Sequence, residues 1–316
     1  MRAVVINQYG GPELLQLVNA ELPPVGQTEL LVEVHACALN PVDFKIRCGE
    51  LAGVFPVKFP HILGADVSGR VCGLGSHATD FKIGDEVYFV NRLNRNGGYA
   101  EFTAVEQSLV AKKPAGLSHV EAAALPLAAL TAIQTLRDFC KLQAGQKVLI
   151  HAGAGGVGTM AIQYARHLGA EIFTTGSRAR QSYLRELGAD RVIDYHTEDF
   201  VTVCNDAGGM DCVLESLGGN HYPKSILATK PGGAVVCIVN PPDSDSLTLS
   251  SDRQIKTDFM LLSPSRKDLS LVRELVENGH LRVYVAHSYP LEEAQAAHSE
   301  LQKGRTQGKL ILQMRN

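Results

Sequence analysis

The spacing of hydrophobic residues divides this chain into a strand-rich first part and a second part in which strands and helices alternate. Up to about residue 120, short runs of β-branched and aromatic residues are separated by turns rich in glycine and proline. Such runs predict strands that fold into a compact, barrel-like domain. They cover residues 3–6, 29–36, 66–74, 86–90 and 99–105.

The pattern changes near Ser118. Ser118 and Glu121 have the spacing of a capping box, which predicts the start of a helix. Beyond it, predicted strands alternate with predicted helices, which indicates a parallel sheet with crossover connections and hence a doubly wound domain. The strands are 148–150, 172–175, 191–193, 210–214 and 234–239, and the helices are 131–139, 160–168, 180–187 and 222–228. In the tail, the expected elements are helices over 269–277 and 291–301 and a strand over 309–312.

Length and composition fit a two-domain globular protein. The chain has 316 residues, 45% of them hydrophobic, and a net charge of −3. It has no run of one charge sign and no apolar stretch of about 20 residues, so we expect neither nucleic acid nor a membrane as a partner. The N-terminus lacks the pattern of a signal peptide. Seven scattered cysteines without a Cys-x-x-Cys motif favour reduced thiols in a cytoplasmic protein.

A glycine-rich segment connects the strand predicted over 148–150 to the helix after it. Residues 153–158 have the pattern Gly-x-Gly-x-x-Gly. In this context Gly153 permits a tight turn, Gly155 lets a pyrophosphate approach the backbone, and Gly158 lets the helix pack on the strand. Free N–H groups at the helix N-terminus would bind the phosphates. The segment therefore predicts a dinucleotide site; the alternative is an ordinary glycine-rich connection.

The residues after the next strand predict which dinucleotide binds. NAD sites usually place an acidic residue at this strand end, where it binds the ribose 2′-OH. Here Ser177 and Arg178 follow the strand, and Glu171 lies at its opposite end. Ser and Arg side chains would bind a 2′-phosphate, so we expect NADP(H). The alternative is that Arg178 and Arg180 are merely exposed at a helix start.

The motifs along nearly the whole chain resemble those of the zinc-independent quinone oxidoreductase and alkenal/enone reductase branch of the medium-chain dehydrogenase/reductase superfamily. The resemblance implies an α/β protein with two domains. One is a GroES-like β-barrel catalytic domain (residues 1–120 and 263–316), and the other is a Rossmann doubly wound parallel-sheet domain (121–262). It also implies a homodimer paired through the last Rossmann strands, near 234–239. The matching segments are 38–47, 64–69, 81–87, 97–101, 124–132, 153–158, 187–190, 192–195, 230–233 and 304–309.

The resemblance further implies that no zinc is bound. In zinc-dependent relatives a catalytic zinc takes three protein ligands. At the matched positions this chain has Asn40 in place of the Cys and Ala65 in place of the His. The structural zinc would need four cysteines, and none lies between Asp85 and Glu106. We therefore expect no metal site, and reduction of an activated acceptor rather than oxidation of an alcohol.

The expected activity is NADPH-dependent reduction of a quinone or an α,β-unsaturated carbonyl. Hydride transfer to either acceptor builds negative charge on an oxygen, which Asn40 or Lys45 would stabilise, and Lys45 could also donate a proton. Alternatively, Asn40 shapes a turn before Pro41 and Lys45 is simply exposed. Alternative functions are an NADPH-binding protein without turnover and a zinc-free alcohol dehydrogenase. The glycine motif and the resemblance together imply the cofactor-binding residues Thr131, Gly153, Gly155, Gly156, Val157, Gly158, Ser177, Arg178, Arg180, Tyr195, Ser216, Val239, Asn240, Leu262, Ser263 and Lys309.

Overall fold

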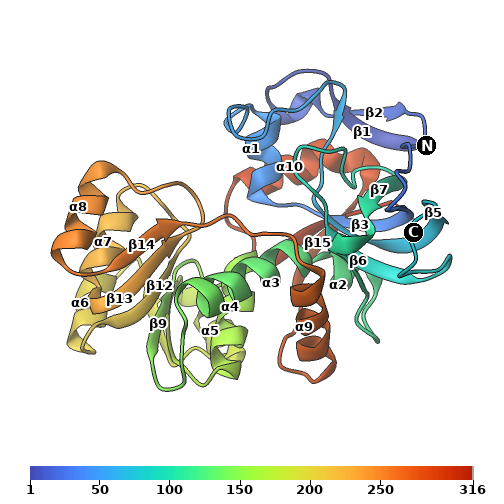
Figure 1. The fold of residues 1–316 in the computed structure, drawn as a ribbon. Coiled ribbons are helices and arrows are strands. Elements are labelled where there is room, and N and C mark those ends of the chain that lie inside the picture. The colour runs from blue at the N-terminus through green and yellow to red at the C-terminus, as the bar shows by residue number, and fades with distance from the viewer. Residues whose placement is uncertain (315–316) are drawn as a thin grey trace. The chain divides into compact units, whose positions relative to one another are not determined.

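In the computed structural model, which describes residues 1–314, the chain forms two compact units (Figure 1). Unit 1 contains Met1–Leu130 together with the tail from Pro264, and unit 2 contains Thr131–Ser263. The expected α/β fold with two domains is thereby confirmed. The first boundary falls at Leu130 rather than at residue 120, because α2 (His119–Ala123) packs on strands β3 and β5 of unit 1.

Unit 1 is built around the long strand β3 (Glu29–Ala38). Strand β5 pairs along one edge of β3, and β7 and the tail strand β16 pair at successive positions along the other edge. Strand β16 belongs to the same sheet, so the tail lies in unit 1. The main sheet has the order β15-β16-β3-β5-β6-β8, with β7 beside β3, and a smaller sheet has the order β2-β1-β4.

Most of the predicted elements of unit 1 are present. The strand expected over 99–105 begins only at Phe102, and the short strands β2, β4, β8 and β15 were not predicted. Strands β2 and β15 lie at sheet edges with mostly exposed or half-exposed residues, so they lack a regular hydrophobic alternation. The remaining bounds are β1 (Arg2–Ile6), β2 (Gln16–Asn19), α1 (Pro41–Arg47), β4 (His61–Ile62), β5 (Asp66–Leu74), β6 (Glu86–Val90), β7 (Phe102–Glu106), β8 (Val110–Lys112), α9 (Arg266–Glu277), β15 (Val285–Pro290), α10 (Ala294–Gln302) and β16 (Lys309–Gln313).

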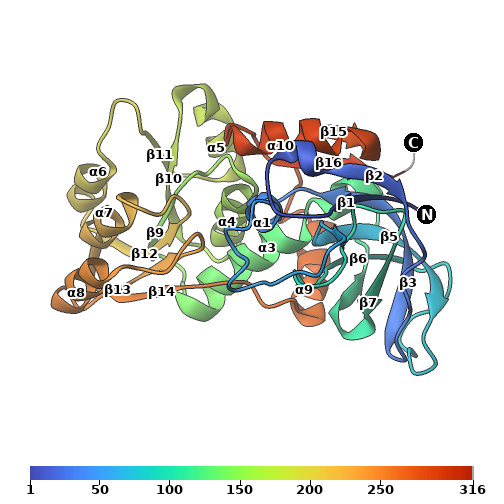
Figure 2. The ribbon, with the colours of Figure 1, turned by 90° about the horizontal axis from the view of Figure 1, so that it is seen from above.

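Unit 2 is a parallel sheet of six strands in the order β11-β10-β9-β12-β13-β14. Helices α4 and α5 cover one face, and α6, α7 and α8 cover the other (Figure 1 and Figure 2). This arrangement confirms the doubly wound fold. The bounds are β9 (Lys147–Ile150), α4 (Gly156–His167), β10 (Glu171–Gly176), α5 (Gln181–Leu187), β11 (Arg191–Asp194), α6 (Phe200–Asp206), β12 (Met210–Glu215), α7 (His221–Leu227), β13 (Thr229–Cys237), α8 (Ser244–Asp252) and β14 (Lys256–Phe259).

The strand expected at a dimer interface is not at the edge of this sheet. Strand β13 lies between β12 and β14, with Ala234–Cys237 in register with Lys256–Phe259. Its hydrogen-bonding groups are therefore used on both sides, and pairing through residues 234–239 is wrong. Strand β14, which the hydrophobic pattern did not predict, forms this end of the sheet.

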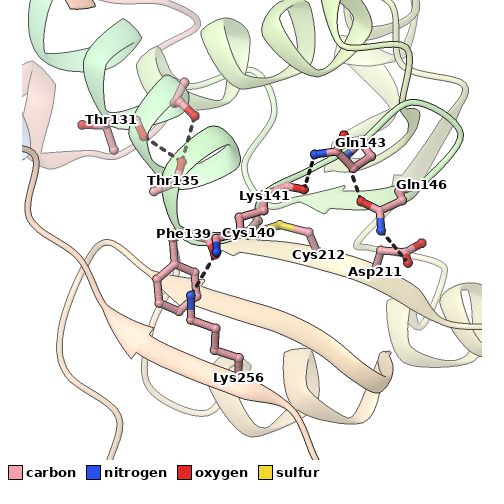
Figure 3. The surroundings of a disulfide bond; sticks show 11 residues. Thr131, Thr135, Phe139, Cys140, Lys141, Gln143, Gln146, Asp211, Cys212 and Lys256 are labelled. Atoms are coloured by element: carbon pink, nitrogen blue, oxygen red, sulfur yellow. Dashed lines mark hydrogen bonds between the residues drawn. A yellow bond between two sulfur atoms is a disulfide. The ribbon is translucent and has the colours of Figure 1, made fainter.

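A disulfide joins Cys140 to Cys212, so the expectation that all seven thiols are reduced is wrong. Helix α3 (Pro126–Ile133) continues into the π-helical turn η3 (Gln134–Phe139), which ends at Cys140. Figure 3 shows this end packed beside Cys212 on β12. The two cysteines are 72 residues apart in sequence, which is why their spacing gave no sign of the pair.

The disulfide predicts that reduction makes two more thiols available for titration. Protein unfolded without a reductant should react with a thiol reagent at five cysteines, and at all seven after reduction. Closing so long a loop restricts the unfolded chain, so Cys140→Ser should lower the free energy of unfolding by about 2–4 kcal/mol. Thiol titration and guanidinium unfolding measure the two effects, with Cys72→Ser as the control. Seven reactive thiols before reduction would contradict the disulfide.

Candidate functional site

The predicted dinucleotide residues of unit 2 gather at one edge of its sheet. In the strand register, Ile150 lies beside both Thr174 and Leu214, Gly176 beside Asp194, and Glu215 beside Cys237. The chain therefore leaves each of these parallel strands at the same level, at the carboxyl edge where doubly wound domains bind ligands. The predicted residues that follow the strands there are Gly153, Gly155, Ser177, Arg178, Tyr195, Ser216, Val239 and Asn240.

The glycine loop leaves the N-terminus of α4 open to an anion. A Cβ atom on Gly153 would lie 2.1 Å from Thr174 Oγ1, and one on Gly158 would lie 2.5 Å from the Ala152 carbonyl, so both positions need glycine for packing. A Cβ on Gly155 would meet only that carbonyl, at 3.3 Å. Gly155 is the N-cap of α4 and provides no side chain to cap its N–H groups. This open, uncapped helix start fits a pyrophosphate.

The segment after β10 has the charge expected for a 2′-phosphate. Ser177 begins it, and Arg178 and Arg180 lie in the short helical turn that follows. Tyr195 follows the neighbouring strand β11 and is 59% exposed. Glu171 lies at the opposite end of β10, in register with Lys147, and is too far along the strand to repel a phosphate at this edge.

Several predicted contacts already have partners inside unit 2. The Ser216 hydroxyl donates to the His151 carbonyl at 3.0 Å. The Ser263 N–H donates to the Gln134 side chain, which donates back to the Ser263 carbonyl, at 2.9 and 2.8 Å. The Asn240 amide donates to Pro241 O at 3.0 Å. These groups stabilise the loops themselves, and the roles of Thr131, Leu262, Ser263 and Asn240 toward a cofactor stay predictions.

In unit 1, the structure brings Asn40, Asp66 and Lys309 together in a buried cluster. The Lys309 ammonium donates to Asn40 Oδ1 and, at 3.3 Å, to Asp66 Oδ2. The Asn40 amide donates to Asp66 Oδ2 at 3.0 Å, and the Leu127 N–H donates to Asp66 Oδ1 at 2.7 Å. Burial raises the pKa of Asp66 and the Lys309 charge opposes that rise. Both ends of the Asn40 amide are thus held in place.

These residues do not fit a zinc ion. Among residues 1–314, no group of three or more His, Cys, Asp or Glu side chains could hold a metal. Ala65 offers no donor atom, and Asn40, at the position of the cysteine ligand, bonds to the Lys309 ammonium. A fixed ammonium repels a second cation, so we derive no chemistry from a metal.

The second catalytic candidate, Lys45, is half-buried in the last turn of α1. A cation is stabilised there by the helix dipole, which agrees with a structural role as well as a catalytic one. Asn40 is the N-cap of this helix, and its N–H donates to Asp43 Oδ2 at 2.7 Å, as in a capping box. The catalytic roles of both residues stay predictions.

A second buried polar group in unit 1 was not predicted. The Tyr99 hydroxyl lies 3.0 Å from His298 Nε2, and Arg47 Nη1 lies 3.4 Å from His298 Nδ1. Burial lowers the pKa of His298 to about 3 and raises that of Asp43 to about 7. Arg47 and His298 are polar residues at buried positions of helices α1 and α10. Their partners are far away in sequence, so the sequence does not show that they meet.

Comparison with known families matches both units. Residues 26–115 match the alcohol dehydrogenase GroES-like domain, and residues 187–312 match the zinc-binding dehydrogenase family. The chain is 32% identical to a chloroplast envelope quinone oxidoreductase homolog of Arabidopsis thaliana, over 99% of this chain and 98% of the relative. It is 34% identical to the 2-methylene-furan-3-one reductase of Solanum lycopersicum, over 99% and 79%.

Comparison with solved structures gives similar proteins of the same kind. The quinone oxidoreductase of Coxiella burnetii superimposes with a TM-score of 0.92 at 33% identity, covering 100% of this chain and 99% of that one. An NAD-dependent alcohol dehydrogenase gives 0.91 at 32%, covering 100% of both chains. The Escherichia coli quinone oxidoreductase complexed with NADPH gives 0.90 at 28%, covering 99% and 100%.

The buried cluster predicts that Asp66 depends on Lys309. Lys309→Met should lower the free energy of unfolding by about 3–5 kcal/mol, because it leaves a buried carboxylate without its cation. Adding Asp66→Leu should recover part of that loss. Denaturant unfolding of both single variants and the double variant measures the coupling. Additive losses in the double variant would show that the two side chains do not depend on each other.

Buried histidines predict loss of stability in weak acid. Burial lowers the pKa of His151 to about 4 and that of His298 to about 3. In the unfolded chain both protonate near their ordinary pKa of 6.5. Stability is therefore full above pH 6.5 and falls as the pH drops toward 4, by about 2 kcal/mol per histidine at pH 5. Asp43, with its raised pKa, opposes this change. Thermal unfolding at pH 7 and pH 5 tests it; equal or higher stability at pH 5 would contradict it.

Proposed function

Since the chain belongs to the quinone oxidoreductase branch of the medium-chain dehydrogenase/reductase superfamily, we propose that it transfers hydride from NADPH to a quinone or an α,β-unsaturated carbonyl without a metal ion. The observation that carries the proposal is the uncapped start of α4 beside the basic segment after β10. A dinucleotide with an extra phosphate matches both features.

Each candidate residue has a defined task in this proposal. The first N–H groups of α4 bind the pyrophosphate, and Ser177, Arg178 and Arg180 bind the 2′-phosphate. The cofactor supplies the hydride. The Lys45 ammonium stabilises the oxygen that becomes negative and can donate the proton that completes reduction. Asn40, held by Lys309 and Asp66, fixes the start of α1, the helix that carries Lys45.

The alternatives have less support. Alcohol oxidation usually requires a Lewis acid, and Asn40, Ala65 and Lys309 do not form a zinc site. Cofactor binding without turnover would not explain why the relatives include named reductases. Both acceptor classes remain in the proposal because the relatives include a quinone oxidoreductase homolog and a furanone reductase.

We also propose that the chain forms a homodimer, in which the edge strand β14, rather than β13, pairs with its counterpart. No helix within residues 1–314 is long and apolar enough to cross a membrane. Partners other than a small-molecule acceptor, such as nucleic acid or a membrane surface, are not expected from a net charge of −3. A cytoplasmic location stays a prediction, and the Cys140–Cys212 disulfide counts against it because reducing compartments rarely preserve disulfides.

Turnover tests the proposal directly. Oxidation of NADPH should be observed with a quinone, an alkenal or an enone, and not with a simple ketone. Lys45→Met should lower kcat by about 100-fold, because the developing charge loses its donor. The control is Lys58→Met, which removes an exposed lysine of the same unit. Absence of turnover with every acceptor would favour the binding-only alternative, and an unchanged kcat would remove Lys45 from the mechanism.

Cofactor preference tests the basic segment. Arg180→Ala should weaken NADPH binding by roughly tenfold, because a charge-assisted hydrogen bond is lost, and should leave NADH binding unchanged. Arg185→Ala, an exposed arginine further along α5, is the matched control. Fluorescence titration with each cofactor gives the dissociation constants. Equal affinity of the parent for NADH and NADPH would contradict the assignment of NADP(H).

A further inference from the structure

Unit 2 buries four polar side chains beneath the carboxyl edge of its sheet. Glu215 ends β12, His151 follows β9, Thr175 lies near the end of β10, and Ser225 lies in α7. All four are at most 4% exposed. The only basic group of the described chain within ion-pair distance of Glu215 is the His151 ring, at 3.5 Å. The proposed chemistry does not use any of the four.

The hydrogen bonds of these side chains run in one direction. The Ala152 N–H donates to Thr175 Oγ1 at 3.0 Å, and the same oxygen lies 3.2 Å from His151 Nδ1. Burial lowers the pKa of His151 to about 4, so its ring is neutral and carries one hydrogen. Ser225 Oγ lies 3.1 Å from His151 Nε2, and its single hydrogen goes to the Glu215 carboxylate. The ring hydrogen therefore lies on Nε2 and is donated to Ser225, which leaves Nδ1 to accept the Thr175 hydroxyl hydrogen. Ser225 then donates to Glu215 Oε2 at 2.5 Å.

Both ends of this relay hold a loop at the ligand edge. At one end lies Ala152, directly before the glycine loop, with a φ of 50° that a non-glycine residue adopts only under constraint. At the other end, Glu215 Oε1 accepts the N–H groups of Leu217 and Gly218, at 2.6 and 3.0 Å. These two bonds turn the chain immediately after β12. The Ser216 hydroxyl, bonded to the His151 carbonyl, joins the same two loops a second time.

We infer that Glu215, Ser225, His151 and Thr175 form a buried relay that positions the glycine loop and the loop 216–219 for NADPH, which makes Glu215 and His151 positioning residues of the cofactor site. The inference rests on the proposed cofactor. Small displacements matter here because N–H groups bind phosphate only when they point at it. Loss of the carboxylate would leave two N–H groups without an acceptor and free both loops to move.

The same strand provides a matched control at its opposite end. Asp211, also on β12, accepts the Lys147 N–H at 2.9 Å and the Gln146 amide at 3.4 Å. Asp211 also pairs with Lys230 at 2.7 Å, so it holds the opposite end of β12 against β9 and β13, away from the carboxyl edge. If Glu215 is purely structural, its loss should lower stability without changing cofactor affinity, as expected for Asp211.

The first experiment compares Glu215→Ala with Asp211→Ala. Glu215→Ala should raise the Kd for NADPH by roughly tenfold, with kcat at saturating NADPH within about threefold of the parent. Asp211→Ala should lower the melting temperature and leave the Kd within about twofold. Glu215→Gln should restore near-parent affinity, because its carbonyl oxygen can still accept both N–H groups. If Glu215→Ala does not fold, Thr175→Val breaks the other end of the relay and should raise the Kd in the same way.

The second experiment reads the relay without a cofactor. The ring ¹⁵N shifts of His151 should show the hydrogen on Nε2 in the parent. In Glu215→Gln the side-chain NH₂ faces Ser225, so the relay must reverse and the hydrogen should move to Nδ1. An unchanged tautomer would overturn the relay. If the parent binds NADPH and Glu215→Ala binds it with the same Kd, only the positioning role is overturned. If the parent does not bind NADPH, the proposed function is overturned and this role with it.

Discussion

The burial of carboxylates without a metal ion is the constraint on which both candidate sites depend. A buried carboxylate needs a cation or several hydrogen-bond donors, because desolvation otherwise costs several kcal/mol. In unit 1 the solution is a cation from the far end of the chain: Lys309 lies against Asp66 and Asn40. That one side chain provides the compensating charge and also bonds Asn40, the residue at the position of the cysteine ligand of zinc-dependent relatives.

Unit 2 solves the same problem without a cation. Glu215 is fully buried, and its oxygens accept two backbone N–H groups and a serine hydroxyl. Because those N–H groups belong to a loop at the ligand edge, the same hydrogen bonds compensate the buried carboxylate and fix the conformation of the loop. Each unit therefore places its buried charge close to the residues that the chemistry needs, where rigidity serves hydride transfer.

The absence of a fitted zinc site changes what the fold can do. A relative with zinc can polarise an alcohol oxygen strongly, whereas a lysine ammonium or an amide provides only a hydrogen bond and, at most, one charge. Such donors suffice for acceptors that are already electron-poor, such as quinones and conjugated carbonyls. The architecture is the one shared with dehydrogenases, but in this chain Asn40, Ala65 and Lys309 do not form a zinc site.

Local patterns in the sequence determined most of the fold and the location of the dinucleotide edge. Hydrophobic runs predicted most strands of both units, the Ser118–Glu121 box predicted the start of α2, and the glycine loop predicted the uncapped start of α4. These features depend on residues a few positions apart, which is why spacing alone reveals them. Short edge strands such as β2 and β15 escaped because exposed strands carry little hydrophobic signal.

Tertiary structure alone decided which distant residues became partners. The pairs Lys309–Asp66, Cys140–Cys212 and His298–Tyr99, and the bonds of the relay from Thr175 to Glu215, join residues between 10 and 243 positions apart. It also placed β13 inside the sheet and gave Ser216 and Ser263 partners within their own unit. The physical reason is that the type of a side chain determines whether it requires a donor, an acceptor or an opposite charge. Only the packed fold determines which distant group provides that partner.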